Sequence, residues 1–366
     1  MTTTRRYAAR ELAELPEVDA ALHRLGLGRM RTSEGAVGRN DNWLGVTTSG
    51  ERVFVKRIAI DSPEGMRRAR RLLRFEGFAR DHADVPVPRC LGSDLDAGVF
   101  VYAAADHAAT GSALMVEERF THVHAAATGR ALAALHEGEL APDAELDDPI
   151  GLLPSSHLLE ALPWPVFERS SAAQLHAWSL MQEDRELCAA VARLETDSAA
   201  ARRTPAHCDF RVDQVLGHPD GVLVCDWEEF RLADPARDTG GFVGEWLYRA
   251  VLDVPTRRGD RAGGPVHLDH GQVVGRGEEK LRRLLPVVQA FWSSYCSRRD
   301  PSPGFAARTA AYAGWHLLDR MLAGAMNVAR LQPIQRAAAG VGRGVLLEPE
   351  LAVPALGLAP ADGCAA

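Results

Sequence analysis

The chain has 366 residues, of which 46% are hydrophobic and 25% are charged, and its formal net charge is −7. This length and composition predict about two domains, or one large two-lobed domain with a sizeable core. The negative charge argues against general nucleic-acid binding, which needs a basic surface.

The six cysteines show no C-x-x-C pair and no zinc spacing, which favours a reduced chain over a disulfide framework. The N-terminal MTTTRRYAARELAEL lacks the continuous apolar region of a signal peptide, and no apolar run approaches the length of a membrane span. We therefore expect a cytoplasmic protein with no membrane or nucleic-acid partner.

The first hundred residues predict a helix followed by a small sheet. Residues 7–25 are typical of an amphipathic helix, and GAVGRNDNWLGVTTSGERVFVKRIAI (35–60) predicts three strands joined by two turns. Its Gly/Asn-rich start can take positive φ and approach a ligand closely. A solvent-exposed hairpin turn would show the same pattern, and the stretch is not a G-x-G-x-x-G.

The third strand carries a lysine with apolar neighbours. Period-two alternation puts Lys56 on the same face as Phe54 and Ile58. This placement indicates an ammonium that reaches a buried anion. The alternative is an edge lysine that extends to water.

Residues 63–81 predict an arginine-dense helix whose apolar side includes Phe75 and Phe78. Glu76 lies beside that side, and we expect it to form an ion pair with Lys56. The arginines favour a solvated face, with an acidic-peptide docking surface as the alternative; they are Arg67, Arg68, Arg70, Arg71 and Arg74.

A strand at Val99–Tyr102 and a small-residue stretch follow, and we place the lobe boundary there. The first lobe then covers residues 1–103 and the second covers 104–347, with a poorly ordered tail at 348–366. Residues 253–274 predict a mobile surface loop, where His267 and His270 favour exposed histidines over a metal site. Helices are expected at 121–137, 171–181, 183–196, 239–252, 277–297, 304–331 and 333–346, with short helical pieces in 137–170.

The segment AHCDFRVDQVLGHPDGVLVCDWEEFRLADPARD (206–238) predicts a β-hairpin. Its strands are expected near Val212–Leu216 and Val222–Cys225, so that Asp209, Gln214 and Asp226 converge at the open end. Two carboxylates and an amide predict a binding site for Mg²⁺. The alternative is a turn-rich hairpin whose acids face water.

A strand lysine, a helix glutamate, a loop Asp and a strand-end Asp with an amide together match the needs of phosphoryl transfer. In HCDFRVDQVL (207–216), VLVCDWEEF (222–230), ADPARD (233–238) and VFVKR (53–57), the chain resembles the aminoglycoside phosphotransferase and choline-kinase branch of the protein-kinase-like fold. This resemblance implies a two-lobed α+β fold, with a small β-rich first lobe and a larger, mainly helical second lobe.

The resemblance also implies roles for single residues. Asp209 would be the catalytic Asp, Asp226 would ligate the metal, and Arg211 would lie near the transferring phosphate. The family usually has Asn where this chain has Gln214, whose longer side chain still offers an amide oxygen to Mg²⁺. The implied nucleotide contacts for ATP or another NTP are Lys56, Glu76, Asn42 and Tyr102, and the implied supports of the catalytic loop are His207, Asp234 and Asp238.

In GRNDNW, VFVKR, HCDFRVDQ, EEFRLADPARD and GEWL, the chain more narrowly resembles the kinase subunit of class V lanthionine synthetases. This implies phosphorylation of Ser/Thr in a precursor peptide in lanthipeptide or thioamitide biosynthesis, with phosphate elimination by a separate lyase subunit. A kinase for aminoglycosides, macrolides or metabolites is the first alternative, and Glu228 and Glu229 leave a cationic acceptor open. A pseudokinase scaffold is the second, which only Gln214 favours.

Overall fold

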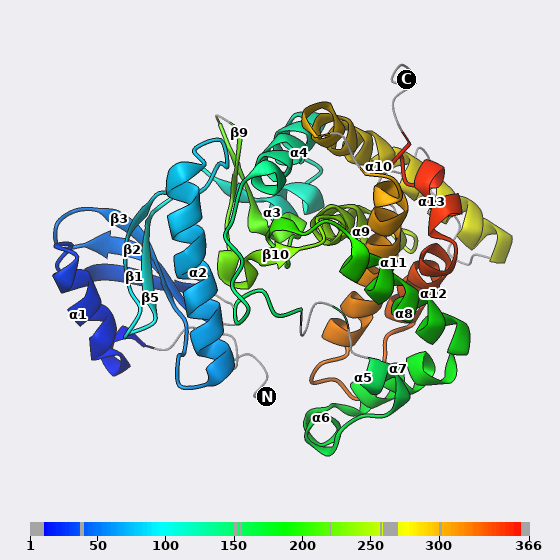
Figure 1. Ribbon diagram of the computed structural model, residues 1–366, viewed down its shortest axis with the longest axis horizontal. Coiled ribbons are helices and arrows are strands. Elements are labelled where there is room, and N and C mark those ends of the chain that lie inside the picture. Colours follow the sequence, from blue (N-terminus) through cyan, green and yellow to red (C-terminus); the bar gives the residue numbers. More distant parts are fainter. Residues whose placement is uncertain are drawn as a thin grey trace.

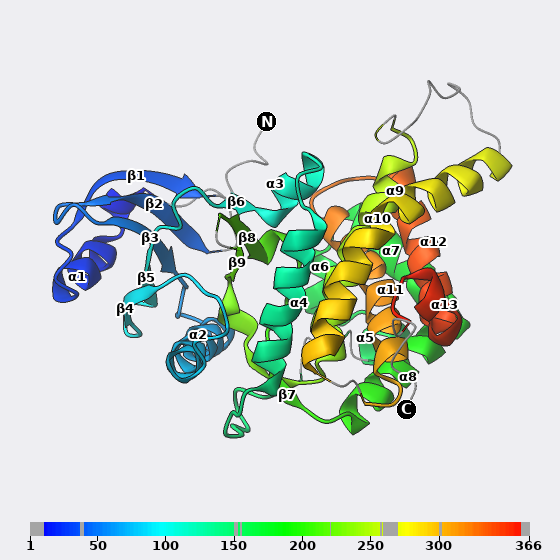
Figure 2. The ribbon, with the colours of Figure 1, turned by 90° about the horizontal axis from the view of Figure 1, so that it is seen from above.

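The computed structural model describes residues 11–36, 40–149, 153, 156–219, 221–256, 258, 270–299 and 302–359. It divides into a small lobe built on one sheet and a larger helical lobe (Figures 1 and 2). Across these ranges, no helix is long and apolar enough to cross a membrane. The two-lobed α+β fold predicted from the sequence is confirmed.

The small lobe is an antiparallel sheet of five strands in the order β1-β2-β3-β5-β4. A short 3₁₀ turn, η2 (Leu12–Glu14), precedes its first helix. The elements are α1 (Pro16–Arg24), β1 (Met30–Ala36), β2 (Asp41–Thr47), β3 (Arg52–Arg57), α2 (Pro63–Asp81), β4 (Cys90–Asp94) and β5 (Val99–Ala103).

Alternation along the strands gives the sheet two different faces. Val53 and Val55 are fully buried in one cluster with Leu22 of α1. Phe100 faces the other way and joins α2 in the cluster that continues into the helical lobe. Since Lys56 pairs with Phe100 in the β3–β5 register, the sheet turns Lys56 toward the second lobe.

The expected hairpin belongs to the second lobe, on the side of that lobe that faces the small lobe (Figure 1). The short strands and 3₁₀ turns are β6 (Ala109–Thr110), β7 (Thr204–Ala206), η3 (Val212–Gln214), β8 (Val215–His218), β9 (Gly221–Val224), η4 (Trp227–Glu229) and β10 (Arg231–Ala233). The helices are α3 (Gly111–Val116), α4 (His122–Glu137), α5 (Ser156–Glu160), α6 (Trp164–Arg169), α7 (Ala172–Glu183), α8 (Arg185–Ala200), α9 (Ala236–Asp253), α10 (His270–Arg298), α11 (Phe305–Gly324), α12 (Pro333–Leu347) and α13 (Pro349–Ala355).

Helices α9 and α11 pack at very short range because glycine faces the contact. A Cβ placed on Gly244 would lie 2.6 Å from the Cβ of His316, closer than side-chain atoms pack. The missing Cβ lets the two backbones approach and brings polar side chains of both helices together beside the hairpin.

Several predicted boundaries differ from the structure. The first hairpin strand begins at Val215 because residues 212–214 form a 3₁₀ turn, and the helix expected over 304–331 ends at Gly324. The expected disorder after residue 348 is wrong for its first part, where α13 forms and Leu356 and Leu358 are buried against the core. Most of the loop expected at 253–274, including His267, lies outside the described residues.

Candidate active site

Lys56 lies between two carboxylates of the second lobe. Its side chain is 7% exposed, and its ammonium forms ion pairs with Asp226 and with Glu228, the latter at 2.7 Å. Burial alone would lower the pKa of Lys56, but the two carboxylates outweigh burial and raise it above its usual value. The ammonium of Lys56 therefore reaches buried anions, and Lys56 is not an edge lysine that extends to water.

The predicted pairing of Lys56 with Glu76 is wrong in this structure. Glu76 accepts a hydrogen bond from the hydroxyl of Tyr102 at 2.8 Å, and burial raises the pKa of its carboxyl despite that bond. Tyr102 and Glu76 thus satisfy each other. The carboxylates that meet Lys56 come from η4 and the residue before it, which the hairpin brings to the sheet.

Glu228 is the functional candidate that sequence reasoning treated only as a general source of acidity. It is 5% exposed, and it also accepts a hydrogen bond from the amide of Asn40 in the first lobe. Burying a carboxylate is costly unless cations or donors surround it. Asn40 and Lys56 provide these partners for Glu228. The signal in the sequence was its place two residues after Asp226.

Two residues of the segment 206–238 have a left-handed backbone conformation. Cys208 has φ of 66° and Asp226 has φ of 68°. Such conformations cost on the order of 1–3 kcal/mol for residues other than glycine and persist where surrounding contacts enforce them. Each of the two strained positions lies next to, or at, a predicted functional aspartate.

Asp238 supplies the contacts that hold the loop. Its carboxylate is fully buried and accepts hydrogen bonds from the backbone amides of His207 at 2.7 Å and Cys208 at 2.8 Å. It also lies 3.2 Å from the Nε2 atom of His136. Burial alone would raise the pKa of Asp238, but these donors lower it below its usual value.

His207 joins the loop to the second strand of the hairpin. Its Nε2 atom lies 2.9 Å from the carbonyl oxygen of Cys225, and its Nδ1 atom lies 3.3 Å from the amide nitrogen of Asp209. A carbonyl only accepts and an amide only donates, so these partners select the tautomer with hydrogen on Nε2. The ring thereby fixes Asp209 relative to Asp226.

Among the described residues, Asp234 forms no hydrogen bond or ion pair with 207–209, although we expected it to support them. It forms an ion pair with Arg308 of α11 at 2.8 Å, and its carboxylate accepts a hydrogen bond from the backbone amide of Ala236 at 3.1 Å. The second contact places its carboxylate at the start of α9. Asp234 therefore anchors the helix that carries Asp238.

The side chains of Asp209 and Arg211 are partly exposed to solvent. The Asp209 side chain is 36% exposed, and the Nε atom of Arg211 lies 3.4 Å from its carboxylate. Arg211 also lies 3.4 Å from Asp213. Burial raises the pKa of Asp213 despite the opposing charge of Arg211, and the carboxylates of Glu245 and Asp209 add smaller contributions in the same direction as burial.

A polar wall from α9 and α11 borders this side of the loop, and sequence reasoning missed it. The Nε2 atom of His316 lies 2.7 Å from a carboxylate oxygen of Glu245. Arg320 interacts electrostatically with both Glu245 and Asp209. Among the described residues, buried atoms of this region without hydrogen-bond partners include the Oδ1 atom of Asp213 and the Nε atom of Arg320.

The donor set suits a hard cation held jointly with phosphates. Within the described residues, His, Cys, Asp and Glu form no cluster of three or more with metal-binding geometry. Mg²⁺ bound to nucleotides uses one or two carboxylates, with phosphate and water oxygens as the other ligands. Asp226 and Glu228 meet that need, because both already surround one cation, the Lys56 ammonium.

Two further predicted ligands lie in the same region. Gln214 is buried, and its amide oxygen lies 3.9 Å from the sulfur of Cys225, a weak contact. Asn42 pairs with Lys56 across β2 and β3. Its buried Oδ1 atom has no hydrogen-bond partner among the described residues. That unpaired oxygen beside Lys56 is consistent with a site that a ligand completes.

The α2 arginines that we expected on one solvated face differ in exposure, because Arg71 is buried whereas Arg70 is 46% exposed. Arg71 is 3% exposed and contacts Glu229, Arg74 contacts Asp147 at 2.6 Å, and Arg70 contacts Glu145 at 3.0 Å. Acidic residues of the second lobe lie opposite the helix, and helical periodicity alone cannot reveal what faces a helix.

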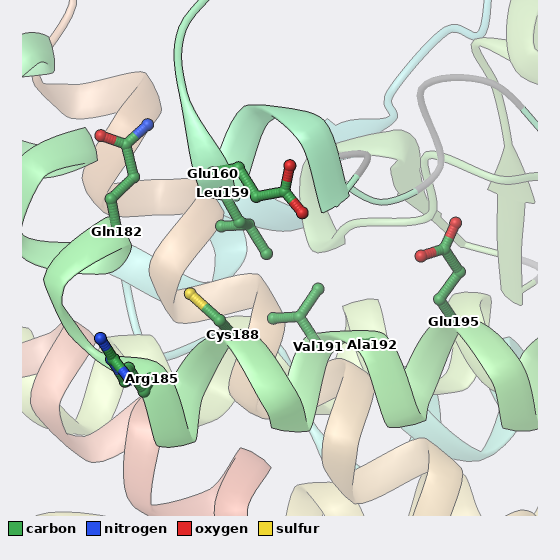
Figure 3. A pocket seen from close by; sticks show the side chains of 8 residues that line it. All are labelled: Leu159, Glu160, Gln182, Arg185, Cys188, Val191, Ala192 and Glu195. Carbon is green, nitrogen blue, oxygen red and sulfur yellow. The ribbon is translucent and has the colours of Figure 1, made fainter.

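A separate cavity lies between α5 and α8 (Figure 3). None of the predicted site residues lines it. Its lining residues are Leu159, Glu160, Gln182, Arg185, Cys188, Val191, Ala192 and Glu195.

The sequence matches the phosphotransferase enzyme family over residues 35–272, more than half of the chain. A search of curated protein sequences found no match.

Three solved structures have a similar fold. A choline/ethanolamine kinase family protein from Mesorhizobium loti has a TM-score of 0.52 and 16% identity, with 95% of this chain and 99% of that chain covered. LicA in complex with AMP has a TM-score of 0.50 and 14% identity, with 88% of this chain and 93% of that chain covered. The amicoumacin kinase hAmiN, in complex with AMP-PNP, Ca²⁺ and Ami, has a TM-score of 0.50 and 11% identity, covering 86% and 88%.

The likeness to these structures shows the fold, and the family match covers the lysine strand, the catalytic loop and the hairpin in one stretch. The chain therefore belongs to the phosphotransferase enzyme family.

Proposed function

We propose that this phosphotransferase is an ATP- and Mg²⁺-dependent kinase that phosphorylates Ser/Thr hydroxyls of a precursor peptide in lanthipeptide or thioamitide-type biosynthesis. The observation that carries the kinase part is the placement of Lys56 against Asp226 and Glu228, across the lobes. One buried cation and two carboxylates supply what a metal–triphosphate complex needs from a protein. In two of the similar structures, the names record AMP, and AMP-PNP with Ca²⁺, which supports a nucleotide and a divalent cation here.

In the proposed reaction, Lys56 exchanges its partners. Without nucleotide, its ammonium neutralises the two carboxylates. A bound triphosphate would offer the ammonium a further anion, and Asp226 and Glu228, with the Gln214 amide, would then hold the metal. The metal, when bound, supplies positive charge to the phosphate oxygens.

Asp209 then acts on the acceptor. Its carboxylate orients the acceptor hydroxyl and accepts its proton as the oxygen attacks the γ-phosphorus and the bond to the β-phosphate oxygen breaks. Asp238 and His207 hold Asp209 in place through the backbone and the ring. Arg211, 3.4 Å from Asp209, is positioned to neutralise charge on the transferred group.

The peptide acceptor is supported by the resemblance of GRNDNW, HCDFRVDQ and EEFRLADPARD to lanthionine synthetase kinase subunits. The phosphopeptide would then pass to a separate lyase. A small-molecule kinase is the second candidate, and the polar wall favours it specifically. Asp213 interacts electrostatically with both Asp209 and Glu245, so the acidic groups here suit an acceptor that bears an ammonium group as well as a hydroxyl group.

The test is phosphate transfer from labelled ATP to two panels of acceptors. One panel contains Ser/Thr peptides with matched Ala peptides, and the other contains aminoglycosides, macrolides and hydroxylated metabolites. The peptide proposal expects label on the Ser/Thr peptides alone. Transfer to the small molecules alone would overturn the peptide assignment, and no transfer to either panel despite nucleotide binding would favour a scaffold.

A further inference from the structure

Helix α2 contacts the turn that carries the two site carboxylates. The ring of Phe75 stacks on Trp227 with centroids 3.8 Å apart and planes 5° apart. Phe75 also meets Phe230 edge-on, with centroids 5.1 Å apart. Trp227 lies between Asp226 and Glu228 in the chain, so the stacking holds the turn that carries both carboxylates.

Arg71 adds a polar contact to that stack. Its guanidinium is 3% exposed and donates to the Leu146 carbonyl at 2.9 Å and to Glu229 at 3.2 Å. One residue earlier in η4, Glu228 lies 3.7 Å from Arg68 of α2. A buried guanidinium with two fixed acceptors defines direction as well as distance, which a single point charge does not.

These contacts give α2 a different role from the one predicted. Its glutamate does not hold Lys56, because Tyr102 satisfies Glu76. The helix instead holds the segment that meets Lys56, through Phe75 and Arg71. The backbone strain at Asp226, with φ of 68°, needs such outside support to persist.

We propose that Arg71 is a positioning residue for the metal-binding carboxylates, acting through Glu229 and the η4 turn. It touches neither nucleotide nor metal. Losing it lets η4 relax from the geometry in which Asp226 and Glu228 bind one cation together. The effect should therefore fall on metal-dependent nucleotide binding. This inference rests on the proposed function only in requiring a metal–nucleotide complex, whatever the acceptor.

The neighbouring arginine provides a matched control. Arg70 pairs with Glu145 at 3.0 Å, and the two side chains are 46% and 58% exposed. Exposed ion pairs contribute little. Arg71→Met and Arg70→Met make the same chemical change one residue apart, so their difference isolates the buried contact.

The experiment measures ATP affinity of the full chain by calorimetry, with Mg²⁺ and with chelator, for wild type and both variants. We expect Arg71→Met to raise the Kd for Mg-ATP about tenfold, with a change below about twofold in chelator, while Arg70→Met matches wild type. Arg71→Lys should recover only part of the loss, because one ammonium cannot reproduce the two directed bonds.

Other outcomes overturn the inference. If Arg71→Met melts earlier but binds Mg-ATP as wild type does, Arg71 is merely structural and the kinase proposal stands. If wild type itself shows no Mg²⁺-dependent binding, the kinase proposal falls, and this inference with it. Should Arg71→Met fail to fold, Glu229→Gln removes the charge that Arg71 contacts, together with the ion pair that Glu229 forms with Arg231. Glu229→Gln must then weaken ATP binding in Mg²⁺ more than in chelator. Wild-type affinity for Mg-ATP in this variant would refute the positioning role of the Arg71–Glu229 contact.

Discussion

Asp238 offers a direct test of how the catalytic loop is held. Asp238→Asn keeps the size of the side chain but replaces one carboxylate oxygen with an NH₂ group. The native carboxylate serves two buried backbone donors, the amides of His207 and Cys208. An asparagine can satisfy only one of them, and its NH₂ group must face the other donor.

The expected loss follows from those contacts. A buried donor left unpaired costs about 1–3 kcal/mol, and the remaining bond loses the strengthening that a charged acceptor gives, about another 1–2 kcal/mol. We therefore expect Asp238→Asn to lower the free energy of unfolding by about 2–5 kcal/mol. That is a large part of a typical total of about 5–15 kcal/mol. Phosphate transfer should fall as well, since the strained Cys208 backbone beside Asp209 loses its support.

Urea denaturation at several pH values measures this loss. The pKa of Asp238 is lower in the folded protein than its usual value, so its stabilisation is complete above the unfolded pKa of about 3.9 and is lost as pH falls through the folded pKa. The difference between wild type and Asp238→Asn should be constant near neutral pH and shrink below about pH 4. Asp84→Asn, at an ion pair whose Asp84 side chain is 61% exposed, should cost about 1 kcal/mol or less. A loss for Asp238→Asn no larger than that control would refute the assigned role.

Three substitutions separate the roles at the reaction centre. Lys56→Ala should weaken nucleotide binding and reduce transfer by roughly 10²-fold or more, because it removes a preorganised charge; wild-type turnover of ATP would contradict this. Asp226→Asn should abolish the Mg²⁺ dependence of nucleotide affinity measured by calorimetry, and an unchanged dependence would remove Asp226 from the metal site. Asp209→Asn should slow single-turnover transfer by on the order of 10²-fold while nucleotide affinity changes little. If rate and affinity fall together, Asp209 belongs to the metal shell instead.

Local patterns in the sequence predicted the elements that carry the site. The α2 helix was predicted at its observed bounds, Pro63–Asp81, where Ser62 caps the first turn by accepting the amide of Gly65 at 3.1 Å. Period-two alternation placed Lys56 on the inner face of the sheet. The hairpin followed from two short apolar runs around a glycine turn. All three signals depend on neighbours within a few residues, so they can be read from the chain alone.

Only the tertiary structure decided which groups meet. Helical spacing places Glu76 beside the apolar side of α2, yet Tyr102 takes its carboxylate, and Lys56 finds Asp226, 170 residues away. The spacing of the α2 arginines predicts a solvated face, but in the structure acidic residues of the second lobe lie opposite several of them. Glu245 and His316, 71 residues apart, meet because Gly244 allows α9 and α11 to approach. Periodicity fixes the face on which a side chain lies, whereas its partner depends on how the lobes and helices pack, which is set by contacts between distant segments.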